Sequence, residues 1–283
     1  MKELIKRIMR GAALILEGLI QGTRALADGA RALPPLTSEK NILVMGNAPS
    51  LNSIDLVRVD RSRFDLLCVN SFACNEQLFF ELKPEYYCIV DPAFFCGSEP
   101  VNGNRRRLFD ALRKVDWHMK IIIPAGCRPP VDNERLSYIH VTRRELHFEA
   151  LPAFRNFLYR RNLCSCGMQN VIVAALSYLI CAKAKAIYMA GVDISEFKGL
   201  YIDENNEVLV ETNYFYGTVR CKFSDMPLEP GEFYKVLECY VRMFRQFHVV
   251  AGFAQAQGVK IYNLSKSSYV DSFERLDSCD ILY

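Results

Sequence analysis

A polar turn directly follows a short apolar run near residue 45, and its residue types suit contact with a ligand. The run Asn41–Met45 leads into Gly-Asn-Ala-Pro-Ser at positions 46–50. Gly46 permits close backbone approach, Asn47 can both donate and accept a hydrogen bond, and Ser50 can bond a phosphate or sugar oxygen. A strand ending in such a turn is typical of nucleotide sites in open α/β sheets, although an ordinary strand-to-helix loop has the same composition.

Three further apolar runs end in polar residues, so that four strand ends can line one crevice. These runs, with the residue after each, are Phe64–Val69 with Asn70, 86–90 with Asp91, and Ala186–Ala190 with the turn that holds Asp193. Apolar runs bounded by turns are typical of parallel strands buried on both faces. Helical patterns lie between them at 73–82, 104–116, 148–159, 167–182 and 231–257, and a last strand is predicted at 259–264. The pattern predicts a single α/β domain with a mostly parallel sheet at 36–283.

The amino-acid composition argues against a nucleic-acid partner, structural disulfides and a metal site. The 283 residues are 51% hydrophobic, and 35 basic against 32 acidic residues give a net charge of +3, which does not indicate a nucleic-acid partner. The eleven cysteines are odd in number, and several lie in apolar runs, which favours free thiols in a reducing, cytoplasmic compartment. Neither the Cys164-Ser-Cys166 spacing nor the four histidines fit a metal site, so we expect neither a metal nor another cofactor.

The pattern of apolar and charged residues in the first 35 positions predicts an amphipathic helix and a linker that ends in Pro34-Pro35. Apolar residues share one face: Leu4, Ile5, Ile8, Ala12, Leu16, Leu19, Ile20 and Leu26. Glu17 within the apolar stretch argues against a signal peptide, and the segment is too short and too charged to span a bilayer. Two partners remain for the apolar face of residues 1–33. One is a membrane surface, and the other is a second subunit in a homo-oligomer. Both are favoured over packing against the chain itself.

Residues 194–230 have the composition of a long mobile loop that contains a small hairpin. Gly199, two prolines and the polar run 203–207 lie in this stretch together with several aromatic residues. Long loops in compact domains often act as lids, and closure of a lid would exclude water from a reactive donor.

Four sequence blocks together resemble the bacterial lipooligosaccharide sialyltransferases of glycosyltransferase family 42 and related proteins of surface-polysaccharide biosynthesis. The first block is 42–51 together with Asp55, the second is 64–70 and the third is 91–95. The fourth begins at 166–167, continues through 190–193 and ends at Tyr201. The whole likeness covers about residues 41 to 264. The resemblance implies a Rossmann-like domain with a lid and no metal. It also implies transfer of a sugar from a CMP-activated donor, with inversion, to a glycan or glycolipid acceptor.

The resemblance also assigns residues. Those expected to bind the nucleotide sugar are Gly46, Asn47, Ser50, Asn70, Cys166, Gly167, Asp193 and Ser195. Asn47 and Asn70 match asparagines that meet the donor, and Gly167 is expected to open the helix beneath the nucleotide. Asp193 is expected to hold a ribose hydroxyl or to order the lid.

Departures from the family pattern concern the chemistry itself. The family has two tyrosines whose hydroxyls assist the departing phosphate. Tyr201 matches one of them, whereas Ser195 stands at the position of the other. Tyr214 stands where the family has its basic histidine, and Asp91 stands where it has an asparagine. A tyrosine with an ordinary pKa near 10 is a poor base, so Asp91, desolvated in a crevice, is the preferred substitute.

The sequence therefore predicts a sialyltransferase-like glycosyltransferase that acts in the cytoplasm, with the option of a peripheral place on the inner face of the cytoplasmic membrane. Two alternatives stay open. An Mg²⁺-dependent pyrophosphokinase-like enzyme would use Asp91 and Asp193 as cation ligands. A nucleotide-binding protein that has lost catalysis would fit the missing histidine.

Overall fold

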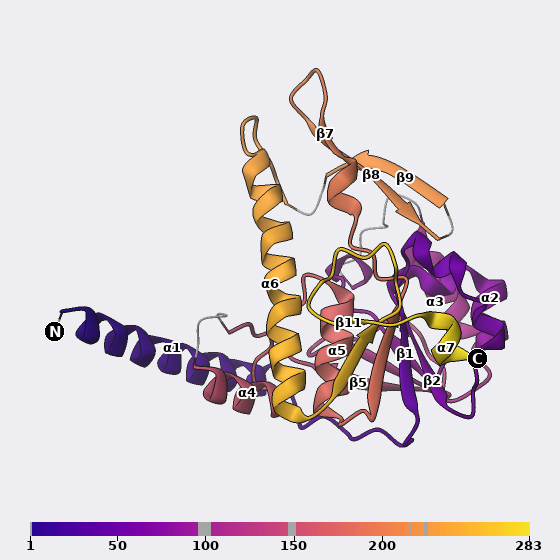
Figure 1. Ribbon diagram of the computed structural model, residues 1–283, viewed down its shortest axis with the longest axis horizontal. Helices are drawn as coiled ribbons and strands as arrows, with labels where there is room; N and C mark the ends of the chain where they lie inside the picture. The colour runs from indigo at the N-terminus through magenta and orange to yellow at the C-terminus, as the bar shows by residue number, and fades with distance from the viewer. Residues whose placement is uncertain (1, 96–102, 147–150, 216, 224–225) are drawn as a thin grey trace.

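The computed structural model describes residues 2–95, 103–146, 151–215, 217–223 and 226–283, and its centre is an eight-stranded parallel sheet (Figure 1). The strand order is β11-β10-β6-β1-β2-β3-β4-β5. The bounds are β1 (Asn41–Met45), β2 (Phe64–Val69), β3 (Tyr86–Cys88), β4 (Met119–Pro124), β5 (Leu136–Val141), β6 (Ala186–Ala190), β10 (Lys260–Asn263) and β11 (Glu274–Arg275). The predicted α/β class with a mostly parallel sheet is confirmed.

Helices cover both faces of this sheet, because the strands are apolar on both sides. In β1, Ile42 and Val44 pack into the core beneath α4 (Pro152–Arg160), α5 (Val171–Cys181) and α6 (Phe233–Gln257). Leu43 and Met45 pack into the opposite core, with α2 (Glu76–Leu82), α3 (Asn104–Arg113) and α7 (Ser278–Leu282). All four side chains have no exposed surface, which explains why the run carries no polar alternation.

The order of the strands reverses beside β1. The chain steps outward through β2, β3, β4 and β5 on one side, then returns to place β6 on the other side of β1. Both neighbours of β1 run parallel to it, with Met45 opposite Cys68 of β2 and Ala190 of β6. The loops after β1 and β6 therefore leave the sheet edge in different directions, which creates the crevice in which open α/β sheets bind ligands.

Several boundaries differ from the sequence prediction. Strands β4 and β5 were not predicted, and β11 follows the 259–264 run that was expected to end the sheet. The helix predicted at 167–182 begins at Val171, because the Asn170 side chain caps it by accepting from the amide of Ile172. The helix predicted at 73–82 begins at Glu76, after a 3₁₀ turn. The prediction at 148–159 falls partly on 147–150, outside the described residues, and α4 runs from Pro152.

The expected loop at 194–230 is largely a folded unit. It holds a short 3₁₀ helix, η5 (Glu196–Gly199), and a separate antiparallel sheet of β7 (Leu200–Ile202), β8 (Val208–Tyr214) and β9 (Gly217–Lys222), drawn in orange in Figure 1. Val208 and Val210 are buried while Leu209 and Glu211 are only partly buried, which is the alternation of a strand. The predicted hairpin is present, but the segment holds three strands and a 3₁₀ helix rather than a loop with one small hairpin.

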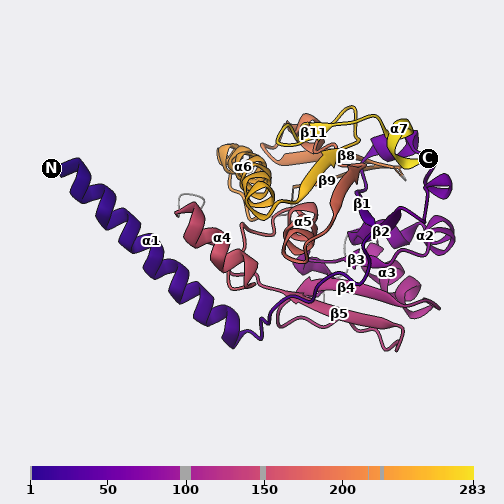
Figure 2. The ribbon, with the colours of Figure 1, turned by 60° about the horizontal axis from the view of Figure 1, so that its bottom comes forward.

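Helix α1 (Lys2–Ala27) extends from the body of the molecule and packs on α4 only in its second half (Figure 2). A Cβ atom at Gly18 would lie 2.6 Å from Cε1 of Phe154 and 2.9 Å from Cδ1 of Leu158, so the glycine allows this close approach. The expectation that the helix does not pack on its own chain was wrong for this half. Within the described residues, no helix combines the length and apolar character that a membrane crossing requires.

Candidate functional site

A pocket of about 140 Å³ lies at the carboxyl ends of β1, β2 and β6, where the strand order reverses. Five residues singled out from the sequence line it: Gly46, Asn47, Asn70, Asp193 and Tyr214. They come from three loops and from the end of β8, and residues 46 and 214 are far apart in the chain. The fold thus brings together three of the four strand ends that were expected to share one crevice, and the fourth, which carries Asp91, does not line the pocket.

The loops after β1 and β6 are locked to each other by close backbone contacts. The amide of Gly46 donates to the carbonyl of Ala190 at 2.8 Å, and that of Ala48 donates to Gly191 at 3.0 Å. A Cβ atom at Gly46 would lie 2.2 Å from the Gly191 oxygen, so no larger residue fits without a backbone shift. The Ser50 amide and hydroxyl both donate to the Asp193 carboxylate, which is buried. These two side chains hold the loops together, so their hydrogen bonds are directed to each other.

Asn47 and Asn70 leave two buried acceptors in the pocket. The Asn47 amide nitrogen donates to the Val69 carbonyl at 3.3 Å, while its Oδ1 has no partner. Asn70 has a left-handed backbone (φ 43°), which asparagine tolerates well, and its Oδ1 also lacks a partner. Buried polar atoms are nearly always hydrogen-bonded, so a ligand that supplies hydrogen-bond donors would satisfy these two oxygens. Sugar hydroxyls and base amino groups are such donors.

The amino-terminal end of α5 forms another wall of the pocket, through Asn170, Val171 and Ile172. A helix begins with unsatisfied N–H groups and a partial positive charge, which suit an anion. Among the described lining residues the charged side chains are those of Asp193 and Glu196. Asn170 was not predicted, although an asparagine just before an apolar run is a helix-start signal.

Glu196 is the residue of greatest chemical interest that the sequence did not reveal. It lines this pocket and also an adjoining one of about 300 Å³, whose other described residues include Ser195, Lys198, Glu211 and Asn213. Burial raises the pKa of its half-buried carboxyl above the ordinary value of 4.5, and the negative charge of Asp193 adds to the shift. The two pockets therefore share one carboxyl group that holds a proton more readily than a free glutamate.

The chain just after β8, in the small antiparallel sheet of β7, β8 and β9, contacts the same site. The Phe215 amide donates to the Asn47 carbonyl at 2.9 Å, and the Asn52 amide nitrogen donates to the Phe215 carbonyl at 3.2 Å. The Phe215 ring packs 5.4 Å from that of Phe72. Tyr214, the last residue of β8, is thereby placed in the lining of the pocket.

Other predicted residues lie elsewhere. Asp91 follows β3 and is exposed, so the enclosed setting expected for a base is not found around it. Tyr201 lies on β7 and is 45% exposed. Ser195 lines the adjoining pocket rather than the one with the asparagines. Cys166 is buried with its Sγ 3.8 Å from the Ser177 hydroxyl, and burial raises the pKa of its thiol to about 12.

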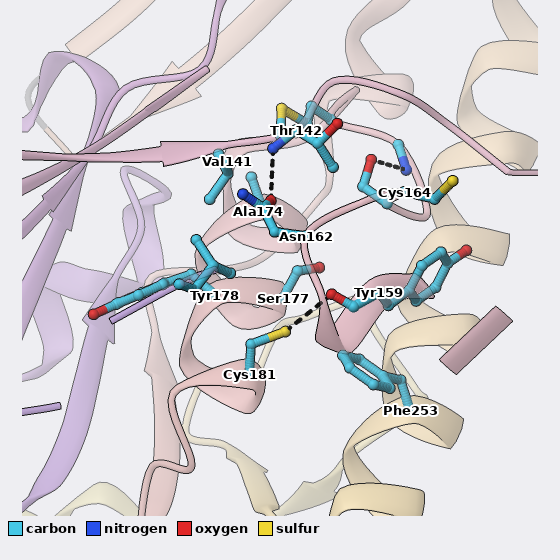
Figure 3. A pocket seen from close by; sticks show the side chains of 14 residues that line it. Val141, Thr142, Tyr159, Asn162, Cys164, Ala174, Ser177, Tyr178, Cys181 and Phe253 are labelled. Atoms are coloured by element: carbon cyan, nitrogen blue, oxygen red, sulfur yellow. Dashed lines mark hydrogen bonds between the residues drawn. The ribbon is translucent and has the colours of Figure 1, made fainter. Parts of the chain in front are cut away.

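Gly167 does not open α5 as expected, because the helix starts four residues later. It lines an interior cavity of about 20 Å³ between the end of β5, α4, α5 and α6 (Figure 3). Ser177, Tyr178 and Cys181 of α5 face this cavity, with Phe253 of α6 opposite. A cavity of this size accommodates about one water molecule and is far too small for a nucleotide. Within the described residues, no group of three or more His, Cys, Asp and Glu side chains is arranged to hold a metal ion.

Fold and site together define a Rossmann-like α/β protein with a ligand pocket at the reversal of strand order and a small sheet docked over it. No protein-family model matches the chain. No curated protein matches it either.

Solved structures with similarity to the chain include sialyltransferases of Campylobacter jejuni. The sialyltransferase CstII in complex with the substrate analogue CMP-3FNeuAc is 15% identical, with a TM-score of 0.40 over 84% of this chain and 86% of that chain. The monofunctional α-2,3-sialyltransferase Cst-I is 13% identical, with a TM-score of 0.44 over 86% of this chain and 82% of that chain.

Proposed function

We propose that this chain is a sialyltransferase-like glycosyltransferase that moves a sugar, a nonulosonic acid, from a CMP-activated donor to a surface glycan or glycolipid, with inversion. The main support is the pair of buried, unpartnered amide oxygens of Asn47 and Asn70, two residues that line the same pocket where the strand order reverses. The resemblance of four sequence blocks to the family 42 sialyltransferases supports the choice of CMP. The proposed enzyme uses no metal.

The roles of the pocket residues follow from their chemistry. Hydroxyl and amino groups of the nucleotide donate to the oxygens of Asn47 and Asn70, which gain the partners they lack. The phosphate lies toward the start of α5, where the helix dipole stabilises the negative charge that grows as CMP departs. Tyr214 adds a hydroxyl above the donor, and the docked lid excludes water that would hydrolyse it.

Glu196 is our proposed general base, because it lies between the two pockets. The acceptor occupies the adjoining pocket, whose polar residues suit sugar hydroxyls. As the acceptor oxygen attacks the anomeric carbon, its proton passes to the Glu196 carboxylate. The bond from that carbon to the phosphate oxygen breaks, and CMP leaves with the electron pair. Glu196 takes the role first given to Asp91, which is exposed and does not line either pocket.

The pyrophosphokinase alternative needs Asp91 and Asp193 to share a cation. Both Asp193 oxygens already accept from Ser50, and Asp91 does not line the pocket, so this geometry does not favour that reaction. A protein that only binds nucleotide would need no carboxyl group between two pockets. We therefore retain the transferase proposal.

The proposal is tested by following CMP release from a CMP-activated nonulosonic acid in the presence of EDTA, with and without a lipooligosaccharide acceptor. We expect release that increases when the acceptor is added. Turnover of ATP that requires Mg²⁺, with no release of CMP, would support the pyrophosphokinase hypothesis instead. CMP binding without any release above buffer would establish the loss of catalysis.

We predict that Asn47→Ala and Asn70→Ala each weaken CMP binding by about 1 to 3 kcal/mol, the cost of losing hydrogen bonds at buried groups. Calorimetric titration measures the change. Asn205→Ala is the matched control, because Asn205 is exposed in the turn between β7 and β8 and does not line the pocket. Wild-type affinity in both pocket variants would remove these asparagines from the site.

A further inference from the structure

Helix α1 exposes a continuous apolar face to solvent. We define this apolar face of α1 by eight side chains that are 37% to 67% exposed: Ile5, Ile8, Met9, Ile15, Leu16, Leu19, Ile20 and Leu26. They are eight of the eighteen large apolar side chains that are exposed in the described part of the chain. Figure 2 shows the helix extending away from the sheet and its covering helices.

The apolar face of α1 is not the face that holds the helix in place. Gly18 and Gly22 pack against α4 and Leu163, and Ala25 is fully buried. At 100° per residue, these three positions lie within a narrow stripe, whereas the apolar face covers an arc of about 140° beside it. Within the described residues, α1 therefore packs on the body mainly through small residues together with Leu14, and the eight side chains of the apolar face stay exposed.

The net charge of the protein is concentrated on the same helix. Residues 2–27 contain five of the 35 Lys and Arg residues and two of the 32 Asp and Glu residues. The rest of the chain is left with thirty of each, so the whole net charge of +3 belongs to α1. The basic residues are Lys2, Lys6, Arg7, Arg10 and Arg24.

We propose that α1 docks this protein on an anionic bilayer surface, with its apolar face in the interface and its basic residues at the lipid headgroups. An apolar arc beside a polar face that is rich in Lys and Arg is the pattern of helices that lie in a membrane surface. A second copy of the chain fits less well, because it would bring two helices of charge +3 together. The arc is also wider than the narrow seam of a two-stranded coiled coil.

The segment after α1 ties this surface to the catalytic body. Asp28 forms an ion pair with Arg144 at 2.6 Å, and the Asn162 amide nitrogen donates to the Arg31 carbonyl at 2.9 Å. Removal of the first 33 residues would break both contacts. Single substitutions on the exposed face are therefore the cleaner test.

The test measures sedimentation of the full chain with vesicles of equimolar phosphatidylglycerol and phosphatidylcholine, and with vesicles of phosphatidylcholine alone. We expect the protein to pellet with the anionic vesicles only, and less so at high salt. Leu16→Glu should lower the bound fraction at least about tenfold, because it places a charge in the interface. Val57→Glu is the matched control, since Val57 is similarly exposed (53%, against 59% for Leu16) but lies outside α1.

Both substitutions are at exposed positions, so unchanged melting temperatures check that the variants fold. Failure of the wild-type chain to bind anionic vesicles, or equal binding by Leu16→Glu, overturns the proposal. A larger mass in light scattering that Leu16→Glu reduces, without vesicle binding, would assign the apolar face of α1 to self-association. The inference does not depend on the proposed transferase activity, which is measured separately by CMP release.

Discussion

Replacement of Glu196 by glutamine is expected to lower turnover by at least about a hundredfold, while CMP binding stays close to that of the wild type. Glutamine keeps the size of the side chain but cannot accept a proton, and general-base catalysis contributes at least about this much. Steady-state release of CMP in the presence of acceptor gives the turnover, and calorimetry gives the binding. Asp91→Asn is the comparison variant and should retain most of the activity.

The pH profile gives a second readout of the same role. Glu196 must be ionised to accept a proton, and its pKa is raised by burial. Turnover should therefore fall on the acid side at a pH above the ordinary value of 4.5, and this limb should vanish in Glu196→Gln. Unchanged turnover and an unchanged acid limb in the variant would show that another group takes the proton.

Gly46→Ala is expected to destabilise the protein by at least about 3 kcal/mol and to abolish CMP binding. The added Cβ atom would lie 2.2 Å from the Gly191 carbonyl oxygen, and neither backbone can move without breaking the contacts between the two loops. Urea unfolding measures the loss of stability.

Gly252→Ala is the control for this effect, because a Cβ atom at that position of α6 meets nothing within 4 Å. Alanine is the better helix former, so this variant should be as stable as the wild type or more so, by up to about 1 kcal/mol. A Gly46→Ala protein of unaltered stability would contradict the close packing of the loops.

The sequence predicted the strands and turns that carry the pocket, because each apolar run there ends in a visible polar residue. Asn47 and Asn70 follow β1 and β2 directly, and parallel strands place such residues at one edge. Strands β4 and β5 were missed. The first ends in proline without a polar residue, and the second mixes exposed polar residues with buried apolar ones, as Leu136–Val141 lies at the edge of the sheet.

Other features depend on contacts between distant residues. Ser50 and Asp193 are 143 positions apart, and only the folded sheet shows that they bond each other rather than a ligand. Glu196 follows Asp193 by three positions without any motif of its own, so its place between two pockets could not be read from the sequence. Residues 194–230 were expected to be a loop because they are rich in glycine, proline and acidic residues, and the run 208–210 shows its alternation only in burial.

Titration of CMP into the wild-type chain in the presence of EDTA, repeated with Asn47→Ala, measures nucleotide binding at the pocket itself. We expect the wild type to bind CMP without metal, and the variant to bind it with an affinity about 5- to 150-fold lower, the equivalent of 1 to 3 kcal/mol. Failure of CMP to bind, or equal binding by both proteins, would contradict a nucleotide site at the pocket where the strand order reverses.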